Sequence, residues 1–83
     1  MDRIIVEVWV PAIDNSFDFE VPAQMTVEEF LQAAIPILEA STQNVRFDDK
    51  VPLLCDQEAN RILEGHQYLS DAGIRDAHRL MIL

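Results

Sequence analysis

The last fifteen residues, 69–83, constrain the fold of this chain more than any other stretch. They read Leu-Ser-Asp-Ala-Gly-Ile-Arg-Asp-Ala-His-Arg-Leu-Met-Ile-Leu. Ser70 and Asp71 are typical of a tight turn, and Gly73 lies where the backbone is expected to need a positive φ, which glycine adopts without steric cost. The apolar run Leu80–Leu83 predicts a strand. The sequence therefore closes with a polar turn and a strand that needs a sheet to join.

Two alternating segments near the N-terminus predict a β-hairpin. In residues 3–10, one face carries Ile4, Val6, Val8 and Val10, and the other carries Ile5, Glu7 and Trp9. Residues 11–16 have turn composition. In residues 17–21, the side chains of Phe17, Phe19 and Val21 share one face. Such a hairpin has an apolar face that another element must cover.

An amphipathic helix is predicted directly after the hairpin. Thr26 and Glu29 have the spacing of a capping box, in which each residue satisfies a backbone amide of the other. The apolar residues that follow at helical spacing are Val27, Phe30, Leu31, Ala34, Ile35 and Leu38. Pro36 lacks an amide proton, so the helix is expected to kink there or to end near Ala34, with one looser turn to Ala40.

The second half of the chain predicts shorter elements. Residues 41–50 read as a loop from which Val45 and Phe47 are expected to fold back onto the core. A strand is predicted over Val51–Cys55 and a short strand over Arg61–Leu63. One core is expected to include Phe17, Phe19, Val27, Phe30, Leu31, Leu80 and Ile82.

This order of elements resembles the ubiquitin-like β-grasp fold over nearly the whole chain. The resemblance implies an α+β fold with a mixed sheet of four to five strands packed on one main helix, and the last strand in the middle of the sheet. It also implies a single ubiquitin-like domain, residues 1–83. The sequence lacks the C-terminal Gly-Gly of ubiquitin-type modifiers, so a binding module is expected instead of a modifier.

Three segments are similar to a narrower group, the YukD/EsaB family: Arg61–Gly65, Leu69–Ile74 and Arg79–Leu83. The resemblance implies a cytoplasmic accessory or regulatory factor of the type VII secretion system of Gram-positive bacteria, which is not an enzyme. Its expected partners are proteins, with membrane components of that machine as candidates. Two alternatives stay open, the ubiquitin-like cytosolic domain of a larger membrane component and a modifier or sulfur carrier without its Gly-Gly tail.

The charge of the chain excludes several partners. The net charge is −9 and the isoelectric point is near 4.3, so nucleic acid and anionic membrane surfaces would repel the protein. No basic residue lies between Arg3 and Arg46. This acidic stretch is either a solvated face or a means of attracting a basic partner. No apolar run approaches the length of a membrane span and no signal-peptide pattern is present, so a cytoplasmic location without membrane insertion is expected.

No residue pattern predicts catalysis, a cofactor site or a metal site. His66 and His78 are expected on surface turns near Glu64 and Asp76, without the further ligands that a metal needs. Cys55 is the single cysteine, which excludes an internal disulfide, and it is expected to pack as a small hydrophobic residue. The sequence therefore favours a protein that is not an enzyme.

The outer face of the sheet is the predicted partner-binding surface. If Leu80 and Ile82 face the core, then side-chain alternation places an apolar set outside, namely Ile5, Trp9, Met81 and Leu83. Partners of ubiquitin meet the corresponding face at a patch that includes a last-strand residue, and Leu83 matches that position. The alternatives are a strand parity shifted by one residue, or a late loop that covers Trp9.

Overall fold

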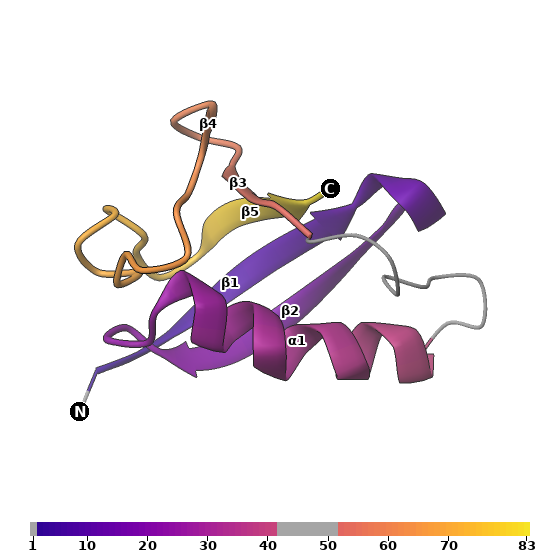
Figure 1. Ribbon diagram of the computed structural model, residues 1–83, viewed down its shortest axis with the longest axis horizontal. Coiled ribbons are helices and arrows are strands. Elements are labelled where there is room, and N and C mark those ends of the chain that lie inside the picture. Colours follow the sequence, from indigo (N-terminus) through magenta and orange to yellow (C-terminus); the bar gives the residue numbers. More distant parts are fainter. Residues whose placement is uncertain (1, 42–51) are drawn as a thin grey trace.

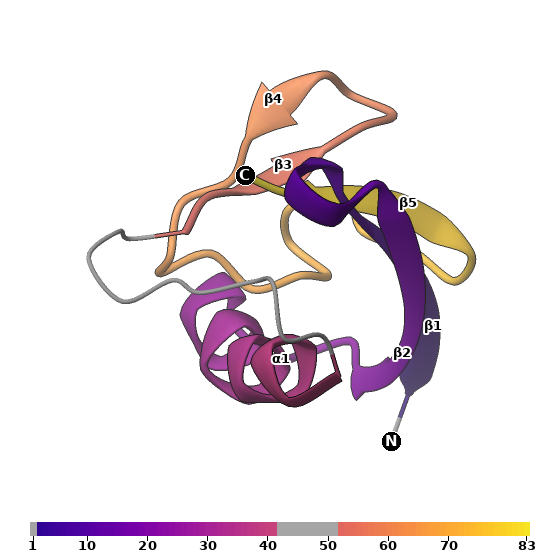
Figure 2. The same ribbon diagram turned by 90° about the vertical axis from the view of Figure 1, so that its right-hand side faces the viewer.

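Five strands form one mixed sheet that curves around a single helix in the computed structural model (Figures 1 and 2). The structure describes residues 2–41 and 52–83. The elements are β1 (Arg3–Val10), a 3-10 turn η1 (Pro11–Ile13), β2 (Asn15–Pro22), α1 (Val27–Ser41), β3 (Leu54–Asp56), β4 (Arg61–Ile62) and β5 (His78–Ile82). The strand order is β2-β1-β5-β3-β4, with β1 and β5 parallel and the other pairs antiparallel. The predicted α+β class and the central place of the last strand are confirmed.

The core fills the space between α1 and one face of the sheet. Val8 pairs with Leu80 across β1 and β5, and both side chains are fully buried. From the helix, Phe30 contributes a ring that meets the Phe19 ring edge-on, with centroids 5.8 Å apart. Every member of the predicted core takes part: Val27, Phe30, Leu80 and Ile82 are buried, and Phe17, Phe19 and Leu31 pack against them half-buried.

The capping box predicted at the start of α1 is present. The amide of Thr26 donates to Glu29 Oε1 at 3.0 Å, and the amide of Glu29 donates to Thr26 Oγ1 at 3.1 Å. The Thr26 hydroxyl also donates to Glu29 Oε1 at 3.0 Å. The two bonds that the carboxylate accepts, from the Thr26 amide and then from the Thr26 hydroxyl, lower the pKa of the Glu29 carboxyl. The two amides between them donate to the carbonyls of Gln67 (2.9 Å) and Gly65 (3.0 Å). The first helical amides therefore all have partners, two of them in a segment far along the chain.

The helix continues past Pro36 to Ser41, so the expectation that it ends near Ala34 was wrong. Pro36 is on the exposed side of the helix, where water can satisfy the carbonyl that loses its partner. Leu38, one turn further on, is fully buried. Burial of such a side chain is worth about 1.5–3 kcal/mol, which is comparable with the cost of about 3 kcal/mol for an interior proline.

The closing turn has the geometry that its residues predict. Gly73 has φ +84°, and the amides of Leu69 and Ser70 donate to the carbonyls of Met25 (2.8 Å) and Ala23 (2.9 Å). These bonds attach the turn to the residues between β2 and α1. Leu69, Ala72 and Ile74 are buried, so the turn closes one end of the core.

Four predicted strands have different bounds in the structure. The second strand is β2, Asn15–Pro22, where residues 17–21 were expected, and the fourth is β4, Arg61–Ile62, where Arg61–Leu63 was expected. The third strand is β3, Leu54–Asp56, where Val51–Cys55 was expected, and β5 begins at His78 instead of Leu80. The predictions for Val45, Phe47 and Val51 concern positions outside the described residues. Within the described part of the chain, no helix is long and apolar enough to cross a membrane.

Phe30→Ala should lower the free energy of unfolding by about 3–5 kcal/mol, because a fully buried ring is lost from the centre of the core. Chemical denaturation measures this change. Ile37→Ala, on the same helix but half exposed, is the control and should cost about 0.5 kcal/mol or less. Equal midpoints for Phe30→Ala and wild type would show that the helix does not pack as described.

Candidate protein-binding surface

The face of the sheet opposite α1 carries a row of apolar side chains that crosses four strands. Strand register sets Trp9 of β1 beside Met81 of β5, Met81 beside Cys55 of β3, and Cys55 beside Ile62 of β4. Neighbouring strands lie about 4.8 Å apart, so the row is roughly 14 Å long. Leu83 lies two residues beyond Met81 on the same face. We call these five residues the outer row.

The outer row is partly exposed to solvent and lines a shallow depression. Ile62 and Leu83 are 58% and 56% exposed, Trp9 and Met81 are half-buried, and Cys55 is buried between its neighbours. A depression of about 390 Å³ lies over the row. Its remaining lining is polar and comes from the end of β3, the turn that follows and the start of β4, with Asp56, Gln57, Asn60 and Arg61. The predicted parity of the strands is therefore right, and Trp9 is left accessible enough to line a depression.

The structure separates Ile5 from the other three predicted residues. Ile5 is 49% exposed and faces outward as predicted. Glu7 lies between Ile5 and Trp9 on this face, and Arg79 of β5 is beside Glu7. Along a strand that rises about 3.3 Å per residue, Ile5 is roughly 13 Å from Trp9. Of the four predicted residues, Trp9, Met81 and Leu83 therefore belong to the outer row, and Ile5 does not.

Two members of the outer row, Cys55 and Ile62, were absent from the predicted set. Ile62 belongs to the short strand predicted over Arg61–Leu63, and alternation there places it opposite the buried Leu63. That signal could have indicated an outward side chain. Only the register of β3 against β4 and β5 shows that both residues join Trp9 and Met81, and this register is not readable from the sequence.

Asp56 holds the turn that carries Ile62. Its Oδ1 accepts the amides of Glu58 (3.0 Å) and Ala59 (3.1 Å) and also contacts Nε2 of His78 at 2.7 Å. Asn60 then completes the turn with φ +56°, a conformation that asparagine tolerates better than most residues. The buried carboxylate thus fixes the path from β3 into β4, and so the position of the end of the outer row.

His78 is not the surface histidine that was expected. Its side chain is 12% exposed and contacts Asp56, which is 2% exposed, while its Nδ1 lies 3.8 Å from Glu58. Asp76, the expected neighbour, accepts the amide of Ile5 at 2.8 Å instead. His78 has the inward parity of Leu80, so strand alternation explains its burial. His66 is exposed beside Glu64, as expected. Residues 2–41 and 52–83 contain no cluster of acidic, histidine or cysteine side chains fit to bind a metal.

Comparison with known proteins identifies the fold. No protein-family model matches the sequence, and no curated protein matches it. Solved structures do. The EccD5 ubiquitin-like domain from Mycobacterium xenopi superposes with a TM-score of 0.81 at 12% identity, over 100% of this chain and 94% of that one. This chain has a ubiquitin-like β-grasp fold.

Two further structures of the same fold are similar to this ubiquitin-like domain. The ubiquitin-like domain of the Mycobacterium tuberculosis type VII secretion system protein ECCD1 has a TM-score of 0.76 at 18% identity, over 100% of this chain and 99% of that one. A chain of the MycP5-free ESX-5 inner membrane complex has a TM-score of 0.82 at 15% identity, over 100% of this chain but 21% of that one. Identities this low establish the fold alone.

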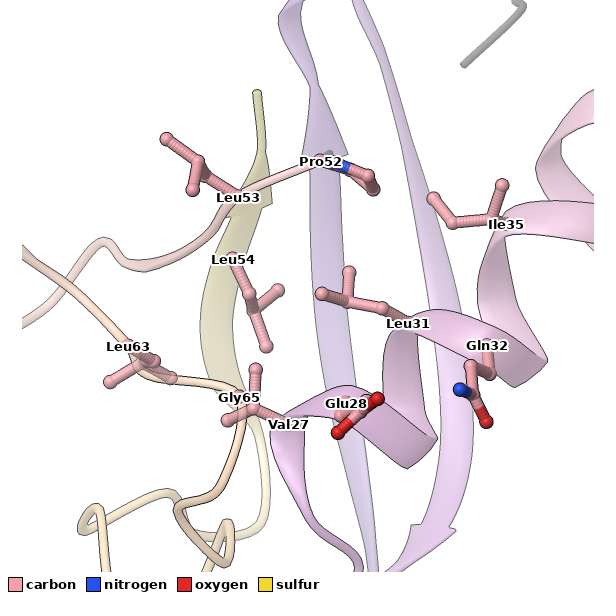
Figure 3. Close-up of a pocket in the computed structure, with 10 residues that line it drawn as sticks. All are labelled: Val27, Glu28, Leu31, Gln32, Ile35, Pro52, Leu53, Leu54, Leu63 and Gly65. Carbon is pink, nitrogen blue, oxygen red and sulfur yellow. The ribbon is translucent and has the colours of Figure 1, made fainter. Parts of the chain in front are cut away.

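A second apolar depression, of about 400 Å³, lies between α1 and the segment that contains β3 (Figure 3). Leu31 of the helix and Leu54 of β3 point toward each other across it, and Gly65 is at its lower edge. Pro52, on its rim, directly follows positions 42–51, which lie outside the described residues.

Two buried groups of the ubiquitin-like domain have shifted pKa values. Burial raises the pKa of the Cys55 thiol, which keeps it protonated and weakly nucleophilic. Burial also acts to raise the pKa of Asp56, but the bonds from His78, Ala59 and Glu58 outweigh it, and the pKa of this carboxyl lies below its ordinary value. The raised pKa of Cys55 favours a structural role for this cysteine. The lowered pKa of Asp56 means that its ionised carboxylate stabilises the folded domain.

Asp56→Asn should lower the free energy of unfolding by about 1–3 kcal/mol near neutral pH, because buried hydrogen bonds lose a charged acceptor. The folded pKa of Asp56 lies below the unfolded one, so this stabilisation is present above about pH 4 and is lost as the pH falls through the folded pKa. Urea denaturation at several pH values should show wild type and Asp56→Asn converging in acid. Parallel curves would contradict the assignment, and Glu64→Gln, at an exposed carboxylate, is the control.

Cys55 should react slowly with a thiol reagent in the folded protein and rapidly in denaturant, because its thiol is buried and mostly protonated. The rate of labelling near neutral pH measures this. Cys55→Ser should lower the free energy of unfolding by about 1–3 kcal/mol, because a hydroxyl without a hydrogen-bond partner replaces a packed sulfur. Labelling of the folded protein as fast as that of the unfolded protein would show that the thiol is open to solvent.

Proposed function

We propose that this domain is a non-catalytic protein-interaction module of a bacterial type VII secretion system. The observation that carries the proposal is the outer row, an accessible apolar surface on the sheet face that α1 leaves uncovered. The likeness to the ubiquitin-like domain of ECCD1, over nearly the full length of both chains, supports the choice of system. The domain works on the cytoplasmic side through protein partners.

The outer row has the composition of an interface centre. Trp9 offers a large ring that is only half-buried in the free domain, and tryptophan is enriched among residues that dominate binding energy. Ile62 and Leu83 present aliphatic side chains that are more than half exposed at the far end. A soluble domain gains from covering such a contiguous surface with a partner.

The chemistry around the row favours binding over catalysis. The one thiol of the sequence, that of Cys55, is buried between its neighbours in the row, and its raised pKa disfavours the nucleophilic form. Asp56, one of the polar residues that line the depression, bonds to His78 and to the turn between β3 and β4. These groups therefore support the surface and are not directed at a substrate.

One observation favours a second form of the same proposal, in which the domain is part of a larger membrane component. The matched chain of the ESX-5 inner membrane complex is about five times longer than the region that this domain covers. The fold therefore occurs within a long chain. A free accessory protein like YukD/EsaB is the first form, and the length of the native protein distinguishes the two. A modifier or sulfur carrier would show a C-terminal Gly-Gly in the intact mass.

Trp9→Asp combined with Met81→Asp should abolish capture of partners from an extract of the native cells, because two charges would be desolvated at the centre of the interface. A pull-down analysed by mass spectrometry measures this, and circular dichroism checks folding. Ile62→Asp combined with Leu83→Asp tests the same surface at more exposed positions. Ile5→Asp, roughly 13 Å away on the same face, is the matched control and should retain the partners. Recovery of all partners by folded outer-row variants would rule out this surface.

A further inference from the structure

The edge of the sheet formed by β2 carries backbone groups that face away from β1. The amide of Ile5 donates to Asp76, and its carbonyl accepts from Ala77, so both groups of Ile5 point toward β5. Backbone groups alternate in direction along a strand, so Ile4 and Val6 bond to β2. Their partners in β2 are Val21 and Phe19, whose backbone groups therefore point toward β1. By the same alternation along β2, the backbone amides and carbonyls of Ser16, Asp18 and Glu20 point away from β1, outward from the edge of the sheet.

Side chains occupy both ends of this edge and leave its centre open. Near one end, Asn15 Oδ1 accepts the amide of Ser16 at 2.9 Å. Near the other, Arg3 donates to the Glu20 carbonyl at 3.3 Å and lies 3.5 Å from the Glu20 carboxylate. No hydrogen bond or ion pair involves the side chain of Asp18 in the part of the chain that the structure describes. Asp18 is thus an unneutralised charge beside an open amide and carbonyl.

An apolar depression adjoins the same edge on the helix side. It measures about 230 Å³ between β2 and α1. Its apolar lining includes Phe19, Met25, Phe30, Ala33, Ala34 and Ile37. In this lining Ile37 is 51% exposed and Phe19 is half-buried. The open backbone edge and the depression are therefore neighbours.

We propose that the β2 edge receives an extended protein segment as a sixth strand, and that this segment alternates basic and apolar residues. Its backbone bonds to the amide and carbonyl of Asp18. Side chains of an added strand alternate between faces. Apolar ones enter the depression beside Ile37, while basic ones lie on the outer face beside the Asp18 carboxylate. The charge of the edge thus selects the partner.

A second copy of this chain fits the edge poorly. Two β2 strands that paired antiparallel about their centre would place Asp18 directly opposite Asp18, and like charges in that position are destabilising. A basic segment gains from the same carboxylate. The edge lies beyond β1 from most of the outer row, so the two surfaces use different residues and can fail independently.

The test is an NMR titration of the 15N-labelled domain with a synthetic seven-residue peptide that alternates lysine and valine. We expect saturable binding with shift changes at residues 16–20 and 33–37. A peptide of alternating glutamate and valine should not bind. The lysine–valine peptide with methylated backbone nitrogens should bind about tenfold more weakly or worse, because it cannot donate to the edge.

Variants of the domain separate the contributions. Asp18→Pro removes the open amide at an edge position that tolerates proline, and should weaken binding by about tenfold. Asp18→Asn keeps the amide and should weaken it by up to about fivefold, the effect of one exposed charge pair. Ile37→Asp should also weaken binding of the lysine–valine peptide. If Asp18→Pro does not fold, Ile37→Asp is the variant that decides the test. Trp9→Asp should bind the peptide normally, whatever the outer row binds.

Several results would overturn the proposal. They are absence of saturation at about millimolar peptide, equal binding of the methylated peptide, or shift changes centred on Trp9 and Met81. Self-association of the wild type through β2, detected by sedimentation and abolished by Asp18→Pro, would instead assign the edge to a second copy of the chain.

Discussion

The start of α1 is the point on which the rest of the structure depends. A helix begins with amides that have no partner inside it. Here Thr26 and Glu29 satisfy two of them, and the carbonyls of Gly65 and Gln67 satisfy the others. These bonds fix the segment before β5 against the segment after β2. The closing turn, with Leu69 buried beneath it, is then held in place for β5 to enter between β1 and β3.

The difference between the two faces of the sheet, one covered by α1 and one exposed, follows from that arrangement. One helix can cover one face, and its burial of Phe30 and Leu38 completes a single core. The other face must remain in contact with water or with a partner. On it, charged residues lie on β2, at Glu7 of β1 and at Arg79 of β5, while the apolar residues collect where β5, β3 and β4 meet the end of β1. The same sheet thus offers an apolar surface and, at its β2 edge, an acidic one.

Local chemistry was enough to predict much of this molecule. The hairpin, the capping box of Thr26, the positive φ of Gly73 and the core faces depend on residues within a few positions of one another. Where long-range contacts decide, the sequence was insufficient. The helix passes Pro36 because Leu38 finds a core. His78 is buried because Asp56, far away in sequence, lies opposite. The candidate surface includes Cys55 and Ile62 because of a register that no local pattern specifies.

The parallel pairing of β1 with β5 has a consequence for the life of the protein in the cell. Trp9 is made early in synthesis, and Met81, its neighbour in the sheet, is made more than seventy residues later. A growing chain on the ribosome can form the hairpin and the helix, but the central strand is missing until β5 emerges. Contacts of such wide sequence separation form late and slowly. The candidate surface therefore forms only after β5 has been made, and a translation product that stops before β5 lacks both Met81 and Leu83.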